Sequence, residues 1–382
     1  MIMGIIRILL ALELVIYHLP DNSIFNYFGM NGSVVVKAFF IISGFYMALV
    51  INEKYLVRDR KTYSLFFSNR YLKLYPAYFI TLIFAILVSY LGFLKWGNWI
   101  YLNSYFVQNL SITSLLIFTV ANLTMFGIAA ISFFSVNLVT GQLFFTATPL
   151  SDAINYIFIG QGWALSIELI FYLIAPFILR KKISVLIGVL ASSLLLRIIL
   201  CYFGYYYNPW ADRFFPTELA FFMLGAIAYK VYSHKKFVKE MNSFFYLIPL
   251  IVISFILLYQ YIPDVIYFCF SLKEWVFFVI LTISLPILFL LSNKMKKIDR
   301  FFSELSYPVF LSHVVFLNLV PIFINFNLDS NFGKTCVIIL TVVYSVFIVV
   351  WVMDPIEKIR KKRIQINMTV NDNENNIEKY EN

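Results

Sequence analysis

The chain has 382 residues, of which 61% are hydrophobic and only 13% are charged. A water-soluble protein of this length could not bury so much apolar surface, so a soluble globular fold is excluded. The net charge of +10 does not indicate nucleic-acid binding, because the basic residues stand in short clusters between apolar segments and report membrane orientation.

Apolar segments of about 17 to 22 residues recur along almost the whole chain, which is the length needed to cross a bilayer. They predict an all-α fold, a polytopic membrane bundle of about ten transmembrane helices. The expected crossings are 4–20, 33–52, 75–94, 163–179, 183–200, 216–233, 243–260, 275–292, 304–326 and 334–353. Basic clusters between them are then all cytoplasmic, as are both termini, and the first segment is a retained helix rather than a signal peptide.

The apolar stretch at 114–136 is the exception in this scheme. It contains the polar residues Asn122, Thr124 and Ser132. A crossing here would place the basic cluster at 180–182 outside, so we expect a re-entrant segment or one that lies along the outer interface. The alternative is an eleventh crossing, with one basic cluster on the wrong side.

We expect a single transmembrane domain at 1–356, followed by a cytoplasmic tail at 357–382. We expect this tail to be disordered, because the residues after Arg363 are polar and rich in Asn and Glu. The three cysteines, Cys201, Cys269 and Cys336, are isolated and match no metal-binding or redox spacing. We therefore expect them to be ordinary helix or loop residues, and we expect no metal site.

The first helix carries ionisable residues where a bilayer normally excludes them. Each costs about 2.5 to 3.5 kcal/mol at the centre of a membrane helix. Arg7 and His18 are eleven residues apart, so they return to nearly one helix face, about 16 Å apart along the axis. Arg7 alone is typical of an anchor near the cytoplasmic surface. His18 lies deeper, and it is either an interfacial residue near the helix end or, as intramembrane ionisable groups usually indicate, part of a functional site. Glu13 points away from that face.

Two later segments have both a structural and a functional interpretation. In "FFSNRYLKLYP", Arg70 and Lys73 lie one turn apart beside the cytoplasmic face. They either clamp a phosphorylated ligand or only mark the topology. In "FFIISGFYMAL", the small pair Ser43 and Gly44 favours either close helix packing or the wall of a narrow ligand tunnel.

Two further segments place ionisable groups in apolar helices. In "WALSIELIFYLIAP", Glu168 stands four residues before Tyr172, on the same face. A buried carboxylate needs a partner, and Tyr172 or a basic group of another helix can supply it. In "LSYPVFLSHVVF", His313 lies near the middle of the membrane, where a histidine is either a helix–helix hydrogen bond or part of a site.

Together these pieces resemble the acyltransferase-3 family of bacterial integral-membrane acyltransferases. The matching pieces, in the family's order, are Arg7 with His18, "FFIISGF", "NRYLKLYP", "WALSIELIFY" and "LSYPVFLSH". The resemblance implies ten helices and transfer of an acyl group, usually acetyl, from cytoplasmic acyl-CoA to a hydroxyl of an extracytoplasmic polysaccharide such as O-antigen, capsule or exopolysaccharide. Lys73 departs from the pattern, since the family commonly has Arg there, and so does Ala164, where a small polar residue is frequent.

The resemblance also implies roles for these residues. His18 would be the catalytic base or the acyl acceptor, and Glu168 would orient it or contact the sugar. Arg7, Arg70 and Lys73 would hold the phosphates of acetyl-CoA, which is the donor substrate rather than a permanently bound cofactor.

Trp163 and Tyr172 would stack on the acceptor, and His313 would line the tunnel or assist proton movement. The implied partners are acyl-CoA, a glycan or lipid-linked glycan acceptor, and the bilayer of the bacterial inner membrane. A competing interpretation is a non-enzymatic exporter or flippase of lipid-linked glycan, which fits the composition and helix count equally well. A glycan polymerase is disfavoured, because the outer region 95–160 has only Lys95 as a basic residue.

Overall fold

The computed structural model describes residues 2–20, 29–55, 59–146, 152–234, 243–292, 296–323, 328 and 330–366. The α-helices are α1 (Ile2–Tyr17), α2 (Gly32–Glu53), α3 (Arg60–Trp96), α4 (Asn103–Val107), α5 (Ile112–Thr124), α6 (Ile128–Ile131), α7 (Gly162–Ile178), α8 (Ile183–Tyr202), α9 (Phe215–Tyr232), α11 (Ile248–Leu257), α12 (Leu272–Ser292), α13 (Lys296–Phe323) and α14 (Asn331–Ile348). A π-helical turn, Val349–Met353, follows α14.

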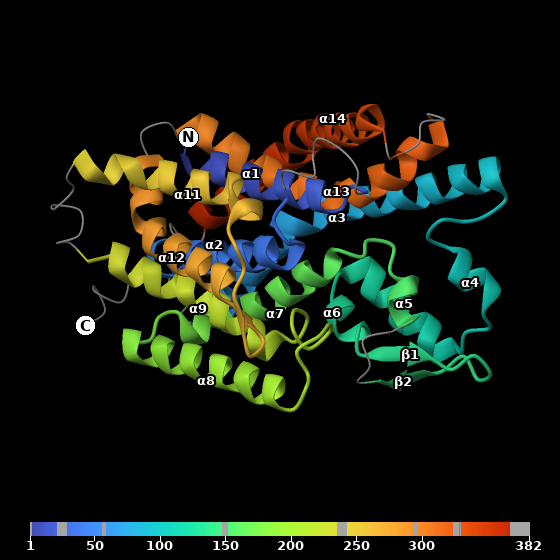
Figure 1. Ribbon diagram of the computed structural model, residues 1–382, viewed down its shortest axis with the longest axis horizontal. Coiled ribbons are helices and arrows are strands. Elements are labelled where there is room, and N and C mark those ends of the chain that lie inside the picture. Colours follow the sequence, from blue (N-terminus) through green and yellow to red (C-terminus); the bar gives the residue numbers. More distant parts are fainter. Residues whose placement is uncertain are drawn as a thin grey trace, which may run out of the picture.

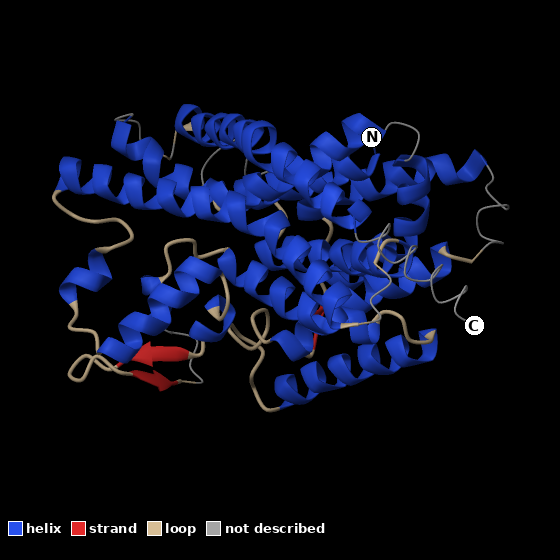
Figure 2. Cartoon of the chain, turned by 180° about the vertical axis from the view of Figure 1, so that it is seen from behind, coloured by secondary structure: helices blue, strands red, loops and turns tan. Residues whose placement is uncertain are grey.

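Strands form only two short antiparallel hairpins in the described residues. In the first, β1 (Phe134–Val136) pairs with β2 (Leu143–Phe145), and Ser135 lies opposite Phe144. In the second, β3 (Ile266–Tyr267) pairs with β4 (Phe270–Ser271). The all-α prediction is therefore confirmed. Figures 1 and 2 show α4, α5 and the β1–β2 hairpin together at one end of the molecule, away from α11 and α12.

A helix lies within or overlaps every segment that we expected to cross the membrane. In the described part of the chain, six helical segments are long and apolar enough to span a bilayer. They are Gly32–Glu53, Arg60–Trp96, Ile183–Tyr202, Leu272–Ser292, Lys297–Ile322 and Asn331–Ile366. The chain is thus a multi-pass helical membrane protein, while the count of ten crossings stays a prediction.

The stretch at 114–136 does not form one continuous helix. Helix α5 ends at Thr124, and the next residues turn through left-handed backbone at Met125 (φ 64°) and Gly127 (φ 81°) before α6 begins. A helix of 13 residues is about 20 Å long, which is too short to span a hydrocarbon core of about 30 Å. The expectation of a segment without a net crossing agrees with this break, and its position in the membrane stays a prediction.

Helix α2 is the central helix of the bundle. Of its most apolar window 83% is buried, compared with 11% for the peripheral α8. It packs backbone to backbone against α9: a Cβ atom on Gly44 would lie 2.0 Å from the Phe222 carbonyl oxygen, and one on Gly225 would lie 1.8 Å from the Ile41 carbonyl oxygen. Of the two interpretations of the Ser43–Gly44 pair, close packing is correct for Gly44.

Because of this close contact, adding a single methyl group at Gly225 should lower the stability of the fold strongly. Gly225→Ala is expected to destabilise the protein by about 1 to 3 kcal/mol or more, because the methyl group meets backbone atoms that cannot rotate away. Thermal unfolding of the purified protein in detergent measures the change. Gly188→Ala on α8 is the control, since nothing lies within 4 Å of the added Cβ there. Equal melting temperatures for the two variants would contradict the contact.

Two sequence-based expectations need correction. Cys201 and Cys269 form a disulfide, with 6.4 Å between their Cα atoms, that joins the end of α8 to the β3–β4 hairpin. The expectation of isolated cysteines was wrong for this pair, because 68 residues separate them in the sequence and only the tertiary fold brings them together. In addition, residues 357–366, expected in a disordered tail, are helical and continue from the π-helical turn. Residues 367–382 lie outside the described part.

Candidate functional site

Two cavities lie inside the helical bundle, and a single layer of side chains separates them. The first, which we call the His18 cavity, has a volume of about 580 Å³ and is lined by His18, Trp163 and the loop before α9. The second, which we call the basic cavity, has a volume of about 410 Å³ and is lined by Arg7, Arg70 and Lys73. Val36 and Phe310 line both cavities, so they form the dividing wall.

Helix α1 connects the two cavities. Arg7 lies in its second turn and lines the basic cavity, whereas His18 follows its last turn and lines the His18 cavity. The eleven residues between Arg7 and His18 correspond to about 16 Å along a helix axis, so one helix and the residue after it supply a side chain to each cavity.

The hydrogen bonding of His18 defines its chemistry. Its Nδ1 lies 2.9 Å from the Leu14 carbonyl oxygen. A carbonyl oxygen only accepts, so Nδ1 carries the proton and the neutral ring has its lone pair on Nε2. In the described structure Nε2 makes no hydrogen bond. His18 therefore offers a free basic nitrogen beside the cavity, which is the arrangement that a general base or a nucleophile needs.

His313 lies behind His18 rather than in a cavity wall. The two ring centroids are 4.9 Å apart, and His313 is completely buried. Its Nδ1 donates to the Phe310 carbonyl oxygen at 2.8 Å, and its buried Nε2 has no partner among the described residues. His313 lines neither of the two cavities, so the geometry gives it a contact with His18 and none with a bound acceptor.

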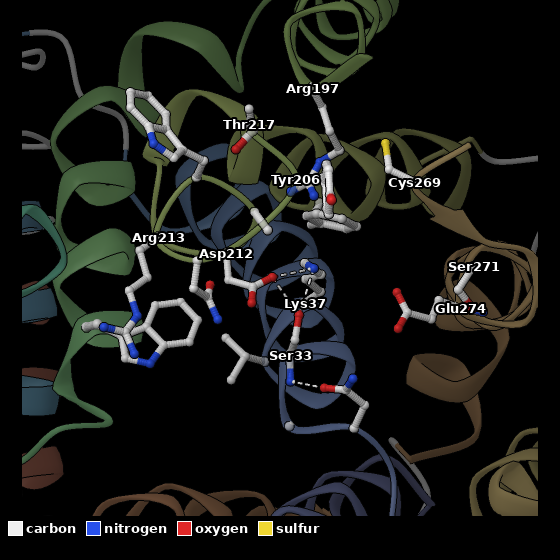
Figure 3. Close-up of a pocket in the computed structure, with 18 of the residues that line it drawn as sticks. Ser33, Lys37, Arg197, Tyr206, Asp212, Arg213, Thr217, Cys269, Ser271 and Glu274 are labelled. Atoms are coloured by element: carbon white, nitrogen blue, oxygen red, sulfur yellow. Dashed lines mark hydrogen bonds and ion pairs between the residues drawn. The ribbon is translucent and has the colours of Figure 1, made fainter. Parts of the chain in front are cut away.

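Ionic groups that the sequence analysis did not identify line the rest of the His18 cavity (Figure 3). Lys37 Nζ lies 2.7 Å from Asp212 Oδ1, and Ser33 donates to the same oxygen at 2.7 Å. Arg197 binds Glu218 at 2.5 Å. The signal in the sequence was present, because Lys37 and Glu218 are ionisable residues within apolar segments.

Asp212 lies in the loop between α8 and α9 and is ionised at neutral pH. Burial favours the protonated form and would raise the pKa of Asp212, but the Lys37 ammonium and the hydrogen bonds from Lys37 and Ser33 hold this pKa at about 2. The ion pair with Lys37 therefore persists over the physiological pH range. Figure 3 shows Glu274 across the cavity from this pair.

Aromatic side chains complete the His18 cavity. The Arg213 guanidinium lies 5.5 Å from the ring centre of Trp163, a cation–π contact, and donates to Ser132 Oγ at 2.7 Å. Tyr205, Trp210 and Trp275 also line the cavity, as does the Cys201–Cys269 disulfide. Flat aromatic faces beside fixed polar groups suit a ligand with both apolar and hydroxylated surfaces, such as a sugar.

The basic cavity brings together the three cations expected from the sequence. Within the described part of the chain, Arg7, Arg70 and Lys73 make no hydrogen bond and no ion pair. The Nε atoms of Arg7 and Arg70 are buried without a hydrogen-bond partner among the described residues, and the Arg70 guanidinium lies 5.9 Å from the centre of the Phe66 ring. Because cationic groups that make no direct ion pair in a partly buried site are costly, this arrangement favours an anionic ligand.

The wall of the basic cavity as a whole is positive. Its basic side chains are Arg7, Lys54, Arg70, Lys73, Arg300, Arg360 and Lys361, and its acidic ones are Glu168, Asp299, Glu304 and Glu357. Partial burial and then the nearby Arg70 guanidinium lower the pKa of Lys54, as expected where cations crowd together. A bound anion would relieve this repulsion.

Glu168 lies in the basic cavity, where it accepts hydrogen bonds from Ser43 Oγ and Tyr172 Oη, both at 2.5 Å. The predicted pairing of Glu168 with Tyr172 is confirmed. The structure does not bring Glu168 to His18, because they line different cavities. It likewise separates Tyr172 from Trp163, the two residues that we expected to share the acceptor.

Glu13, the third ionisable residue of the first helix, has a structural role. It is buried, and its carboxylate accepts a hydrogen bond from the Met30 backbone nitrogen at 3.1 Å. It therefore ties α1 to the residues that precede α2. As the sequence indicated, it does not share the face of Arg7 and His18.

A family model described as an acyltransferase domain matches residues 3–354. The chain belongs to the acyltransferase-3 family. The match covers every site residue predicted from the sequence, so the resemblance is confirmed over nearly the whole chain. The protein is a multi-pass membrane acyltransferase. Searches among curated proteins and among solved structures found no match.

Proposed function

We propose that the protein is a membrane O-acyltransferase that moves an acyl group, usually acetyl, from cytoplasmic acyl-CoA to a hydroxyl of an extracytoplasmic polysaccharide. The observation that carries this proposal is the placement of Arg7 and His18 on one helix, in two cavities that share a wall of Val36 and Phe310. One cavity suits a phosphorylated donor, the other suits a sugar, and the basic nitrogen of His18 belongs to a residue that lines the sugar cavity.

The basic cavity suits acyl-CoA because it combines two kinds of surface. Arg7, Arg70 and Lys73 supply positive charge for the phosphates. Phe39 and Phe289 supply an apolar wall for the acyl and pantetheine arm. The arm would extend toward the dividing wall and present its thioester to the His18 cavity.

In the proposed transfer, His18 acts as the general base. His18 Nε2 takes the proton of the acceptor hydroxyl while the hydroxyl oxygen attacks the thioester carbon. The new C–O bond forms, the C–S bond breaks, and the CoA thiolate leaves and takes up a proton. An alternative is attack by His18 Nε2 itself, with an acyl-histidine that the sugar then cleaves. The lone pair on Nε2 serves either route.

The disulfide supports the assignment of the His18 cavity to the outer side of the membrane. Disulfides persist in oxidising compartments and are rare in the cytosol, and Cys201–Cys269 lines the His18 cavity. The basic clusters, in contrast, favour the cytoplasmic side, and the cluster that contains Arg70 and Lys73 lines the basic cavity. The donor cavity then faces the cytoplasm and the acceptor cavity faces outward, as expected for an inner-membrane enzyme.

The experiment that tests this proposal measures O-acetyl groups on the surface polysaccharide by NMR, in wild-type cells and in cells from which the gene is deleted. Loss of acetate at unchanged polymer amount is the expected result. Unchanged acetate with loss of polymer would instead support a non-enzymatic exporter or flippase of lipid-linked glycan. A second readout is thermal stabilisation of the purified protein by acetyl-CoA, which an exporter should not show.

A further inference from the structure

A helical segment beyond the family match forms part of the basic cavity. The match ends at residue 354, but the helix continues through residue 366. From this segment, Glu357, Arg360, Lys361 and Ile364 line the basic cavity. The cavity wall is therefore completed by residues that the family assignment does not cover.

Three side-chain contacts fasten this segment to α3 next to Arg70. Arg360 is buried, and its Nε donates to the Asn69 carbonyl oxygen at 2.7 Å. Arg363 donates from Nη1 to Asn69 Oδ1 and from Nη2 to Ser68 Oγ, both at 2.9 Å. Because Asn69 precedes Arg70 directly, these bonds fix Arg360 close to the unpaired guanidinium of Arg70.

The two basic residues of the segment differ in depth. The Arg360 side chain is only 8% exposed, and its Nη1 binds Glu357, while its Nη2 makes no hydrogen bond to a described residue. The Lys361 side chain is 57% exposed and lies 3.8 Å from the other oxygen of Glu357. One cation is thus held inside the cavity wall, and the next residue places another toward solvent.

We propose that the helical segment 354–366 is part of the donor site, and that Arg360 and Lys361 bind phosphate groups at the nucleotide end of acyl-CoA. This inference rests on the proposed function. A phosphate gains most from a guanidinium whose geometry is already fixed, as that of Arg360 is by Asn69. Lys361, whose side chain is exposed to solvent, adds a hydrated positive charge to the phosphate site.

Neighbouring lysines on this helix offer a matched test. Lys361 and Lys362 are both exposed and carry the same charge, but only Lys361 lines the basic cavity. We expect Lys361→Gln to weaken the binding of acetyl-CoA to the purified full-length protein by roughly three- to tenfold. Lys362→Gln should leave it unchanged. Titration calorimetry in detergent measures both, with 3′,5′-ADP as a second probe that contains only the nucleotide end.

Arg360→Lys is the second variant. It keeps the positive charge and the helix but removes the planar guanidinium, which can donate two parallel hydrogen bonds to a phosphate. This substitution should weaken the binding of both acetyl-CoA and 3′,5′-ADP by about tenfold or more. Equal affinities of the wild type and Lys361→Gln, or equal losses in Lys361→Gln and Lys362→Gln, would overturn the inference and leave the proposed function standing. A wild type that binds no acetyl-CoA would overturn the proposed function itself and this inference with it.

Discussion

Replacing His18 with alanine is expected to lower the rate of acetyl transfer by about 10² to 10⁴-fold, the usual contribution of a positioned general base. The physical reason is the loss of Nε2, the nitrogen left free when Nδ1 donates to the Leu14 carbonyl oxygen. Acetyl-CoA binding should be retained, because His18 lines the His18 cavity and the donor phosphates are assigned to the basic cavity. The variant should therefore have a lower kcat and an unchanged Kd for acetyl-CoA.

Transfer to a glycan acceptor by the purified protein in liposomes measures the rate, and titration calorimetry measures the donor affinity. His234→Ala is the control, since His234 is exposed beyond the end of α9 and lines neither cavity. Transfer at the wild-type rate by His18→Ala would remove His18 from the mechanism. Loss of donor binding together with activity would show that the role of His18 is structural.

Properties that depend on a single helix were predictable from the sequence. The Arg7–His18 relation follows from helical periodicity, and Arg70 and Lys73 are one turn apart in α3. Tyr172 was one of two candidate partners of Glu168 for the same reason, since it stands one turn along α7, and it is the one that donates to Glu168. In each case the distance along the chain fixes the distance in space.

Properties that depend on contacts between distant segments were not predictable. Lys37 is 175 residues from Asp212 in the sequence, and Cys201 is 68 residues from Cys269. The cavity that a side chain lines is also set by the packing of several helices. For that reason the expectation that Glu168 orients His18 or contacts the sugar could not anticipate that Glu168 lines the basic cavity.

The end of the domain illustrates a third limit. A tail was expected from residue 357, because a basic cluster at 358–363 and then polar residues follow the last apolar segment. The helix nevertheless continues, since Arg360 and Arg363 find hydrogen-bond partners on α3 that composition does not reveal. A basic segment after the last apolar helix can thus be part of a site rather than only a marker of topology.

Arg70→Ala is expected to weaken acetyl-CoA binding by about 10- to 100-fold, the loss of a charge-assisted hydrogen bond worth about 1.5 to 3 kcal/mol. Arg70 is buried and lines the basic cavity, and in the free protein it makes no hydrogen bond or ion pair with a described residue. The unliganded variant should therefore melt no lower than the wild type, because removing a desolvated charge offsets the loss of the contact with the Phe66 ring and no hydrogen bond or ion pair to a described residue is broken.

The combination of these two results separates a binding residue from a structural one. Thermal unfolding with and without acetyl-CoA measures both, and the stabilisation by acetyl-CoA should shrink in Arg70→Ala. Arg60→Ala is the matched control, because Arg60 is exposed at the start of the same helix and does not line the basic cavity. A large fall in the melting temperature of unliganded Arg70→Ala would mean that Arg70 holds the fold. A wild-type response to acetyl-CoA would mean that the phosphates bind elsewhere, and the basic cavity would then need another anion to explain its unpaired cations.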